Sequence, residues 1–133
     1  MKQIVVLRKD LNMRKGKMIS QGCHASSEIC MQLASLSSPW APGLTLGELH
    51  EKHISWFRQW QTQHAHTKIC VSVDSESELL DLYKKAVVAG LPCALVQDIG
   101  KTEFNGIATY TALAIGPAPL DLLDPLTGHL KLL

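Results

Sequence analysis

The sequence lacks any apolar run near the roughly 18 residues that a membrane-spanning helix needs. Near its start, Arg8, Lys9 and Asp10 interrupt the apolar residues 4–7 almost at once, so no secretory signal is expected. We therefore expect a cytoplasmic protein without a membrane partner. Its 133 residues are 46% hydrophobic and 19% charged, which favours one globular domain over a disordered or fibrous chain.

Cysteine is scarce and never occurs in Cys-x-x-Cys spacing; the four residues are Cys23, Cys30, Cys70 and Cys93. Two ligands close in sequence are what a zinc site usually needs, so none is expected from them. In a reducing compartment they are predicted to be small buried hydrophobic residues. Histidines offer another metal hypothesis, resting on His50, His53, His64 and His66. Because no acidic ligand cluster accompanies them, we predict neither a metal nor a cofactor.

The net charge is only +1, which gives no general attraction to nucleic acid. Its distribution is uneven, because six of the thirteen basic residues fall in the first seventeen positions: Lys2, Arg8, Lys9, Arg14, Lys15 and Lys17. A local basic patch can bind phosphates, although a solvated basic loop fits the same pattern. Aromatic residues amount to 5% and form no obvious row on which bases could stack.

Hydrophobic periodicity predicts strands at residues 4–7, 67–73, 93–96 and 109–115. Helices are predicted at 16–35, 46–63, from about 76 to 87, and briefly at 120–123, with Ser75 and Glu78 forming a capping box. Strand–helix–strand units favour a mixed, largely parallel sheet with helices on its faces. The predicted fold class is therefore α/β: a single three-layer α/β/α domain over residues 1–133 with a mixed four-stranded sheet. Residues 36–64 form an enlarged connection.

The first predicted helix is amphipathic at about 100° per residue. One polar stripe contains Lys17, Gln21, His24 and Glu28. The opposite arc, predicted to face the core, contains Met18, Gly22, Ala25 and Ile29, with Ile19, Cys23 and Cys30 beside them. In the second helix the residues roughly in register are Leu49, His53, Trp56, Phe57 and Trp60.

Two polar segments follow predicted strands, and catalytic groups in such sheets tend to lie beyond the carboxyl ends of strands. In the first, Lys17 lies in the first turn of a helix, where a cation opposes the helix dipole unless an anion must be bound. The second contains Asp98, Gly100 and Thr102. Each segment alone also has a simpler explanation, an exposed lysine with a surface His24 in the first case and an ordinary turn in the second.

Taken together, these segments resemble the type II peptidyl-tRNA hydrolase family. That family shows Asp-Leu-x-Met-Gly-Lys-Gly-Lys followed by Ala-Ala-Gln-Cys-x-His-Ala, matched here by residues 10–25. Its strand ending Asp-x-Gly-Arg-Thr is matched at 98–102, Thr-x-Leu-x-Ile-Gly-Pro at 111–117, and the tail Thr-Gly-His-Leu-Lys-Leu from 127. The departures are Arg14 for Gly, Ser20 for Ala, Gly22 for Cys, Lys101 for Arg, and an altered segment 104–109.

The resemblance implies a metal-independent carboxylic ester hydrolase that splits peptide, or an N-blocked aminoacyl group, from tRNA. The family's proposed catalytic positions correspond to Lys17, Asp98 and Thr102. We expect Asp98 to position Lys17 and a water, Lys17 to stabilise the oxyanion, and Thr102 to orient the water or the ester. Gln21 and His24 would bind substrate or relay a proton, and the sequence leaves open whether His24 or Lys17 is the base.

Substrate binding is expected from Arg14, Lys15 and Lys101 against tRNA phosphates, with Thr111 also at the substrate. The family further suggests a homodimer. Trp56, Phe57 and Trp60 fit either a dimer interface or the core of one subunit.

Two other functions remain open at this point. One is a non-catalytic tRNA- or protein-binding module of the same fold, which Gly22 and the segment after Thr102 favour. The other is hydrolysis of a different acyl ester, such as another aminoacylated RNA.

Overall fold

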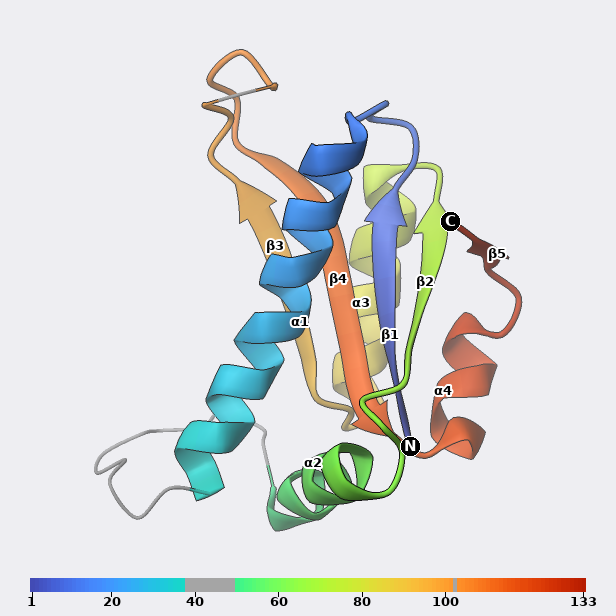
Figure 1. Cartoon of the computed structure of the whole chain (residues 1–133). Helices are drawn as coiled ribbons and strands as arrows, with labels where there is room; N and C mark the ends of the chain where they lie inside the picture. Colours follow the sequence, from blue (N-terminus) through green and yellow to red (C-terminus); the bar gives the residue numbers. More distant parts are fainter. Residues whose placement is uncertain (38–49, 102) are drawn as a thin grey trace.

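Within residues 1–37, 50–101 and 103–133, which the computed structural model describes, the chain forms four helices and five strands (Figure 1). For residues 35–37 only the backbone is described. The elements in chain order are β1 Lys2–Arg8, α1 Lys15–Ser37, α2 Glu51–Thr62, β2 Lys68–Val73, α3 Glu76–Val88, β3 Cys93–Asp98, β4 Thr109–Ala118, α4 Leu120–Thr127 and β5 Lys131–Leu132. None of the described helices is both long enough and apolar enough to cross a membrane.

The five strands form one mixed sheet in the order β3-β4-β1-β2-β5. The predicted α/β class with a mixed sheet is confirmed. The predicted predominance of parallel pairs is wrong, because only β1 and β2 are parallel, and the other three neighbouring pairs are antiparallel. The count of four strands is also wrong. The fifth, β5, pairs with β2 through only two residues, too few to show a period in the sequence.

Alternating residues of the central strand β1 contribute to two separate hydrophobic clusters. Ile4 and Val6 pack in the cluster that contains residues of α3 and α4, whereas Leu7 packs in the cluster that contains residues of α1 and α2. Figure 1 shows α1 running in front of the sheet and α3 behind it. This alternation explains why residues 4–7 form an uninterrupted apolar run.

Helix α1 is rotated relative to the prediction. Its buried stripe is Gln21, Ala25, Ile29 and Leu33, at intervals of four. Ile19, predicted to face the core, is 67% exposed, whereas Gln21, predicted to be on the polar stripe, is 2% exposed. A polar residue can occupy the buried stripe when its amide is hydrogen-bonded, and that of Gln21 is.

The aromatic residues of α2 belong to the core of the single chain. Phe57 and Trp60 are buried, and Trp56 packs partly buried against the other cluster. Of the two interpretations given above, core packing is the correct one for these residues. The predicted helix start at residue 46 and Leu49 lie outside the described residues, and the helix as described begins at Glu51.

His53 of α2 has a structural role. Its Nδ1 accepts from the backbone N–H of His50 at 3.1 Å, and its Nε2 lies 2.9 Å from the carbonyl of Gly90. Burial lowers the pKa of His53. A neutral ring that donates from Nε2 satisfies both contacts, so the apolar-face histidine is a core residue.

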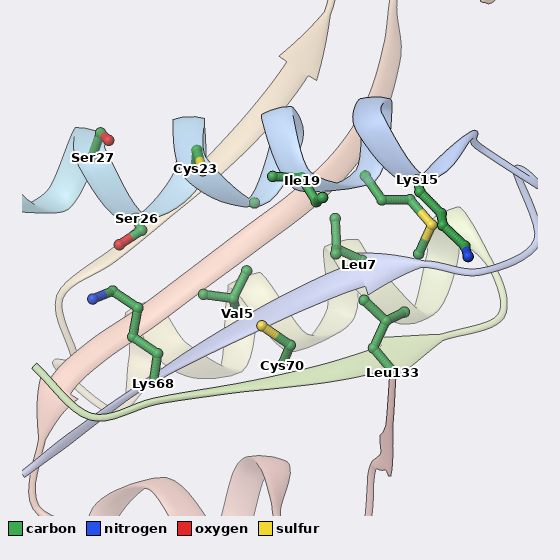
Figure 2. Close-up of a pocket in the computed structure, with 12 residues that line it drawn as sticks. Val5, Leu7, Lys15, Ile19, Cys23, Ser26, Ser27, Lys68, Cys70 and Leu133 are labelled. Atoms are coloured by element: carbon green, nitrogen blue, oxygen red, sulfur yellow. The ribbon is translucent and has the colours of Figure 1, made fainter.

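The cysteine prediction is wrong for two residues. Cys23 and Cys70 are exposed, while Cys30 and Cys93 are half-buried beside the core. The exposed pair lies where α1 borders β1 and β2, a part of the sheet's front face that α1 leaves open (Figure 2).

Candidate active site

A partly buried ion pair joins the two polar segments that the sequence singled out. Lys17 lies in the first turn of α1, and Asp98 is the last residue of β3. Lys17 Nζ lies 2.7 Å from Asp98 Oδ2, and the two side chains are only 12% and 13% exposed. The two polar segments therefore meet at one edge of the sheet.

The two carboxylate oxygens of Asp98 have separate partners. Oδ1 accepts the backbone N–H of Gly100 at 2.8 Å, which is an Asx turn. Oδ2 accepts from Lys17 and, at 3.3 Å, from Gln21 Nε2. The turn explanation is therefore correct for Oδ1, while Oδ2 contacts the other polar segment.

These contacts keep Asp98 ionised. Its hydrogen bond from Lys17 is the main cause that lowers the pKa of Asp98, burial opposes it, and the Gly100 N–H and Gln21 amide lower it further. A carboxylate with a lowered pKa is a weak base at neutral pH. The arrangement therefore favours Asp98 as the residue that fixes Lys17.

Gly100 is required by the turn itself. Its φ is +84°, and a Cβ there would lie 2.5 Å from the carbonyl oxygen of Ile107. Any larger residue would push apart the two ends of the connection between β3 and β4. The Asp-x-Gly spacing thus fixes Asp98 through its own backbone.

A buried hydrogen-bond chain continues from Asp98 to the middle of the sheet. The Gln21 side chain donates to Asp98 and accepts a short hydrogen bond from Thr111 Oγ1. Thr111 is fully buried and Gln21 is 2% exposed. The sequence predicted that these two side chains contact substrate, but both are buried, and this burial does not support that prediction. Gln21 instead holds Asp98 through a hydrogen bond, and Thr111 holds Gln21.

An irregularity in β4 places Thr111 in this chain. Val96 pairs with Ala112, but the next residue, Gln97, pairs with Tyr110, so Thr111 is the extra residue of a bulge. In a regular strand Thr111 and its neighbour Ala112 would point to opposite faces. At a bulge they can share one, and here Thr111 reaches α1 on the face where Ala112 also packs.

Sequence reasoning did not identify Phe104 as part of the site. Lys17 Nζ lies 5.6 Å from the centre of its ring, within the range of a cation–π contact. Phe104 is half-buried against the cluster under α1. The sequence feature that could have identified Phe104 is its position in the altered segment 104–109, because an aromatic residue there can cover the lysine.

Two further residues, His24 and Thr102, were predicted to be catalytic. His24 is exposed, and its Nε2 lies 3.3 Å from Ser20 Oγ on the same helix. Thr102 lies outside the described residues.

The basic cluster is smaller than the sequence suggested. Arg8 is buried, holds Asp10 through two hydrogen bonds of 3.1 and 2.7 Å, and donates to the Tyr110 carbonyl at 3.1 Å. Lys2 is at the opposite end of β1. Arg14, Lys15 and Lys101 are exposed near the ends of α1 and β3, as expected for phosphate contacts.

Among the described residues no group of three His, Cys, Asp or Glu side chains could hold a metal ion. The chemistry available to the described side chains is that of a fixed cation. A lysine held by an ionised carboxylate in a half-buried setting can stabilise negative charge that develops on an ester oxygen.

An apolar groove of about 620 Å³ lies on the other flank of α1, over β1 and β2 (Figure 2). Figure 2 shows Val5 and Leu7 beneath it, Ile19 and Cys23 on the α1 side, and Leu133 at its edge. Lys17 and Asp98 do not line this groove. Gly22 does, so the departure at residue 22 lies away from the ion pair.

Comparison with known proteins gives consistent results over the full length. A family model described as Peptidyl-tRNA hydrolase PTH2 matches residues 1–133. A peptidyl-tRNA hydrolase of Methanocaldococcus jannaschii is 42% identical over 133 residues, covering 100% of both chains. Similar enzymes of Aeropyrum pernix and Sulfurisphaera tokodaii are 39% and 38% identical, over 98% and 99% of this chain and 94% and 98% of theirs.

Proposed function

Because this chain belongs to the PTH2 family of peptidyl-tRNA hydrolases, we propose that it hydrolyses the ester between a peptide and the 3′ end of tRNA. The observation that supports this most is the partly buried pair of Lys17 and Asp98 at the sheet edge. Its relatives carry the name of that activity, and the ion pair supplies a group that the reaction needs. Turnover is therefore favoured over a purely binding module.

Lys17 is the proposed oxyanion-stabilising residue. Attack of water on the ester carbonyl places negative charge on its oxygen, and a lysine ammonium close to that oxygen lowers the barrier. Asp98 keeps Lys17 in place, because its carboxylate accepts a hydrogen bond from Lys17 Nζ at 2.7 Å. Phe104 covers the lysine from another side and limits its hydration.

Thr102 is proposed to orient the water or the ester, because it follows Asp98 by four residues in the sequence. His24 is proposed to relay a proton or to contact substrate from the exposed flank of α1. Gln21 and Thr111 are proposed as positioning residues. Their buried hydrogen bonds set the orientation of Asp98 rather than touching substrate.

Arg14, Lys15 and Lys101 are proposed to hold tRNA phosphates. All three are exposed, and they lie at the start of α1 and shortly after the end of β3. Contacts of this kind give an affinity that depends on salt and not on nucleotide sequence. Such recognition suits an enzyme that must accept many different tRNAs.

We also propose that the enzyme acts in the cytoplasm as a homodimer. The apolar groove beside α1 is a surface that a second copy could cover, because Ile19 at its rim is 67% exposed. Sedimentation velocity of Ile19→Lys beside the unchanged protein tests this assignment. A dimer that persists in the variant would place the interface elsewhere, and a monomeric unchanged protein would exclude the dimer.

The deciding experiment measures release of free tRNA from N-acetyl-aminoacyl-tRNA and from the unblocked aminoacyl-tRNA. We expect release from the first only. Lys17→Ala and Asp98→Ala should each lower kcat at least about a hundredfold in a folded protein. Binding of tRNA without release above the uncatalysed rate would instead favour the binding module. Near-normal kcat in both variants would mean that the assigned site is wrong.

A further inference from the structure

Strand β3 is an edge of the sheet that leads directly to the proposed active site. In the strand order β3 has β4 on one side and no strand of the described residues on the other. Figure 1 shows it at the left edge of the sheet, with α1 running alongside. Its last residue is Asp98.

A groove of about 680 Å³ follows this edge. Its floor is five consecutive residues of β3, numbers 93–97. Successive residues of a strand point to opposite faces, so a groove lined by all five runs along the open backbone edge rather than over one face. His24, Glu28 and Gln32 of α1 line it from one side, and Tyr83 of α3 from another.

The edge has little of the protection that natural proteins give to exposed strands. Cys93, Ala94, Leu95 and Val96 include no charged residue and no proline. Open edges of this kind usually carry a lysine, a proline or a covering element, because free N–H and C=O groups pair readily with another chain. An unprotected edge that ends at a reactive site is therefore suited to binding an extended peptide.

We propose that the peptide part of peptidyl-tRNA binds along β3 as an added strand. This inference rests on the proposed function and names how its substrate is held. The ester is at the carboxyl end of the peptide and must lie beside Lys17 and Asp98. The peptide therefore runs parallel to β3, with its carboxyl end at Asp98 and its earlier residues toward Cys93.

Recognition through the backbone has two consequences for specificity. Any peptide sequence can pair, because the hydrogen bonds involve only N–H and C=O groups. An aminoacyl-tRNA with a free amino group has no peptide amide before the ester and loses these contacts. The tRNA remains outside the groove, near the exposed Lys15 and Lys101.

Peptide length gives the first test. N-acetyl-glycyl-tRNA serves as the reference, and the series extends it one glycine at a time to six residues. Because the groove floor is five residues long, kcat/KM should rise about tenfold or more in total and level off near five residues. A flat series, with the reference still hydrolysed, would overturn the proposal and leave the proposed function intact. No hydrolysis of any member would overturn both.

Removal of single backbone donors gives the second test. Sarcosine replaces glycine at one position of the five-residue substrate at a time. In a strand only alternate N–H groups point at the neighbouring strand, so kcat/KM should fall about two- to tenfold at every second position and change little between them. Losses without that alternation would mean that the peptide is not bound as a strand.

A matched pair of variants places the binding at this groove. Gln32 lines the groove about 22 Å along α1 from Lys17, and Ser27 is an exposed residue of α1 on its other flank. Gln32→Tyr should lower kcat/KM for the five-residue substrate and leave N-acetyl-glycyl-tRNA unchanged, whereas Ser27→Tyr should change neither. Equal effects of both variants would overturn the assignment. If kcat/KM does not change with peptide length, and Gln32→Tyr dissociates a dimer of the protein, the β3 edge would instead bind a second copy of the chain.

Discussion

Replacing Thr111 with valine tests whether the chain from Thr111 through Gln21 controls the ion pair. Valine keeps the shape of threonine but removes the hydroxyl that donates to Gln21 Oε1. Both side chains are buried, so no bulk water replaces the lost donor. The amide oxygen of Gln21 is then left unsatisfied, and its amide group is no longer held toward Asp98.

The expected cost follows from that burial. An unsatisfied buried polar group costs about 1–3 kcal/mol, so the free energy of unfolding should fall by about that amount. A less firmly held Asp98 should lower kcat about tenfold, equivalent to about 1.4 kcal/mol in the barrier. KM should change little, because the proposed phosphate contacts of Arg14, Lys15 and Lys101 are untouched.

Urea unfolding and steady-state release of tRNA measure the two effects. Thr109→Val is the matched control, since Thr109 lies on the same strand but is half-exposed and donates only to the Ile107 carbonyl of its own loop. It should stay within about 0.5 kcal/mol of the unchanged protein. In a Gln21→Met background, Thr111→Val should have a much smaller effect, because the Gln21 amide oxygen to which Thr111 donates is then absent.

Two outcomes would refute this reasoning. One is unchanged stability and kcat in Thr111→Val. The other is full additivity of Thr111→Val and Gln21→Met, which would show that the two side chains act independently.

The remaining predictions concern the charges of the site. Lys15→Gln should raise KM, leave kcat unchanged and reduce the salt dependence of tRNA binding by about one released counterion. Lys17→Gln should instead lower kcat and change that salt dependence less. Identical results for the two variants would mean that Lys17 is another phosphate contact. The pKa of Asp98 is lowered, so its ionised form stabilises the fold above the ordinary aspartate pKa of about 4, and this stabilisation is lost as pH falls through the lower folded value. The excess stability over Asp98→Asn, measured by urea unfolding, should therefore be constant from pH 7 to about 5 and shrink below about 4; a difference unchanged at pH 3 would contradict the pairing. EDTA should leave the rate unchanged, and a loss that zinc restores would revive the metal hypothesis.

Local sequence determined most of the elements and the location of the site. The apolar residues 4–7 correctly predicted a central strand. Ser75 is the N-cap of α3, with its Oγ accepting the Glu78 N–H at 3.1 Å, but the Glu78 carboxylate accepts the backbone N–H of Asp74, so only half of the predicted capping box forms. The contact of Lys17 with Asp98 was expected from the family resemblance. It forms where β1 and β3, which run in the same direction on either side of β4, end. These features depend on short-range propensity or on strand order, both of which leave a pattern in the sequence.

Tertiary structure alone decided which side of the site each residue occupies. Gln21 and His24 belong to one polar stripe in the sequence, yet Gln21 is buried and His24 exposed. The difference depends on Thr111, ninety residues further along, which satisfies the buried amide. Thr111 itself faces α1 only because β4 has a bulge, and a bulge depends on pairing with β3 rather than on any local pattern. Helical and strand periods indicate faces, but the register between distant strands decides which polar group finds a partner inside.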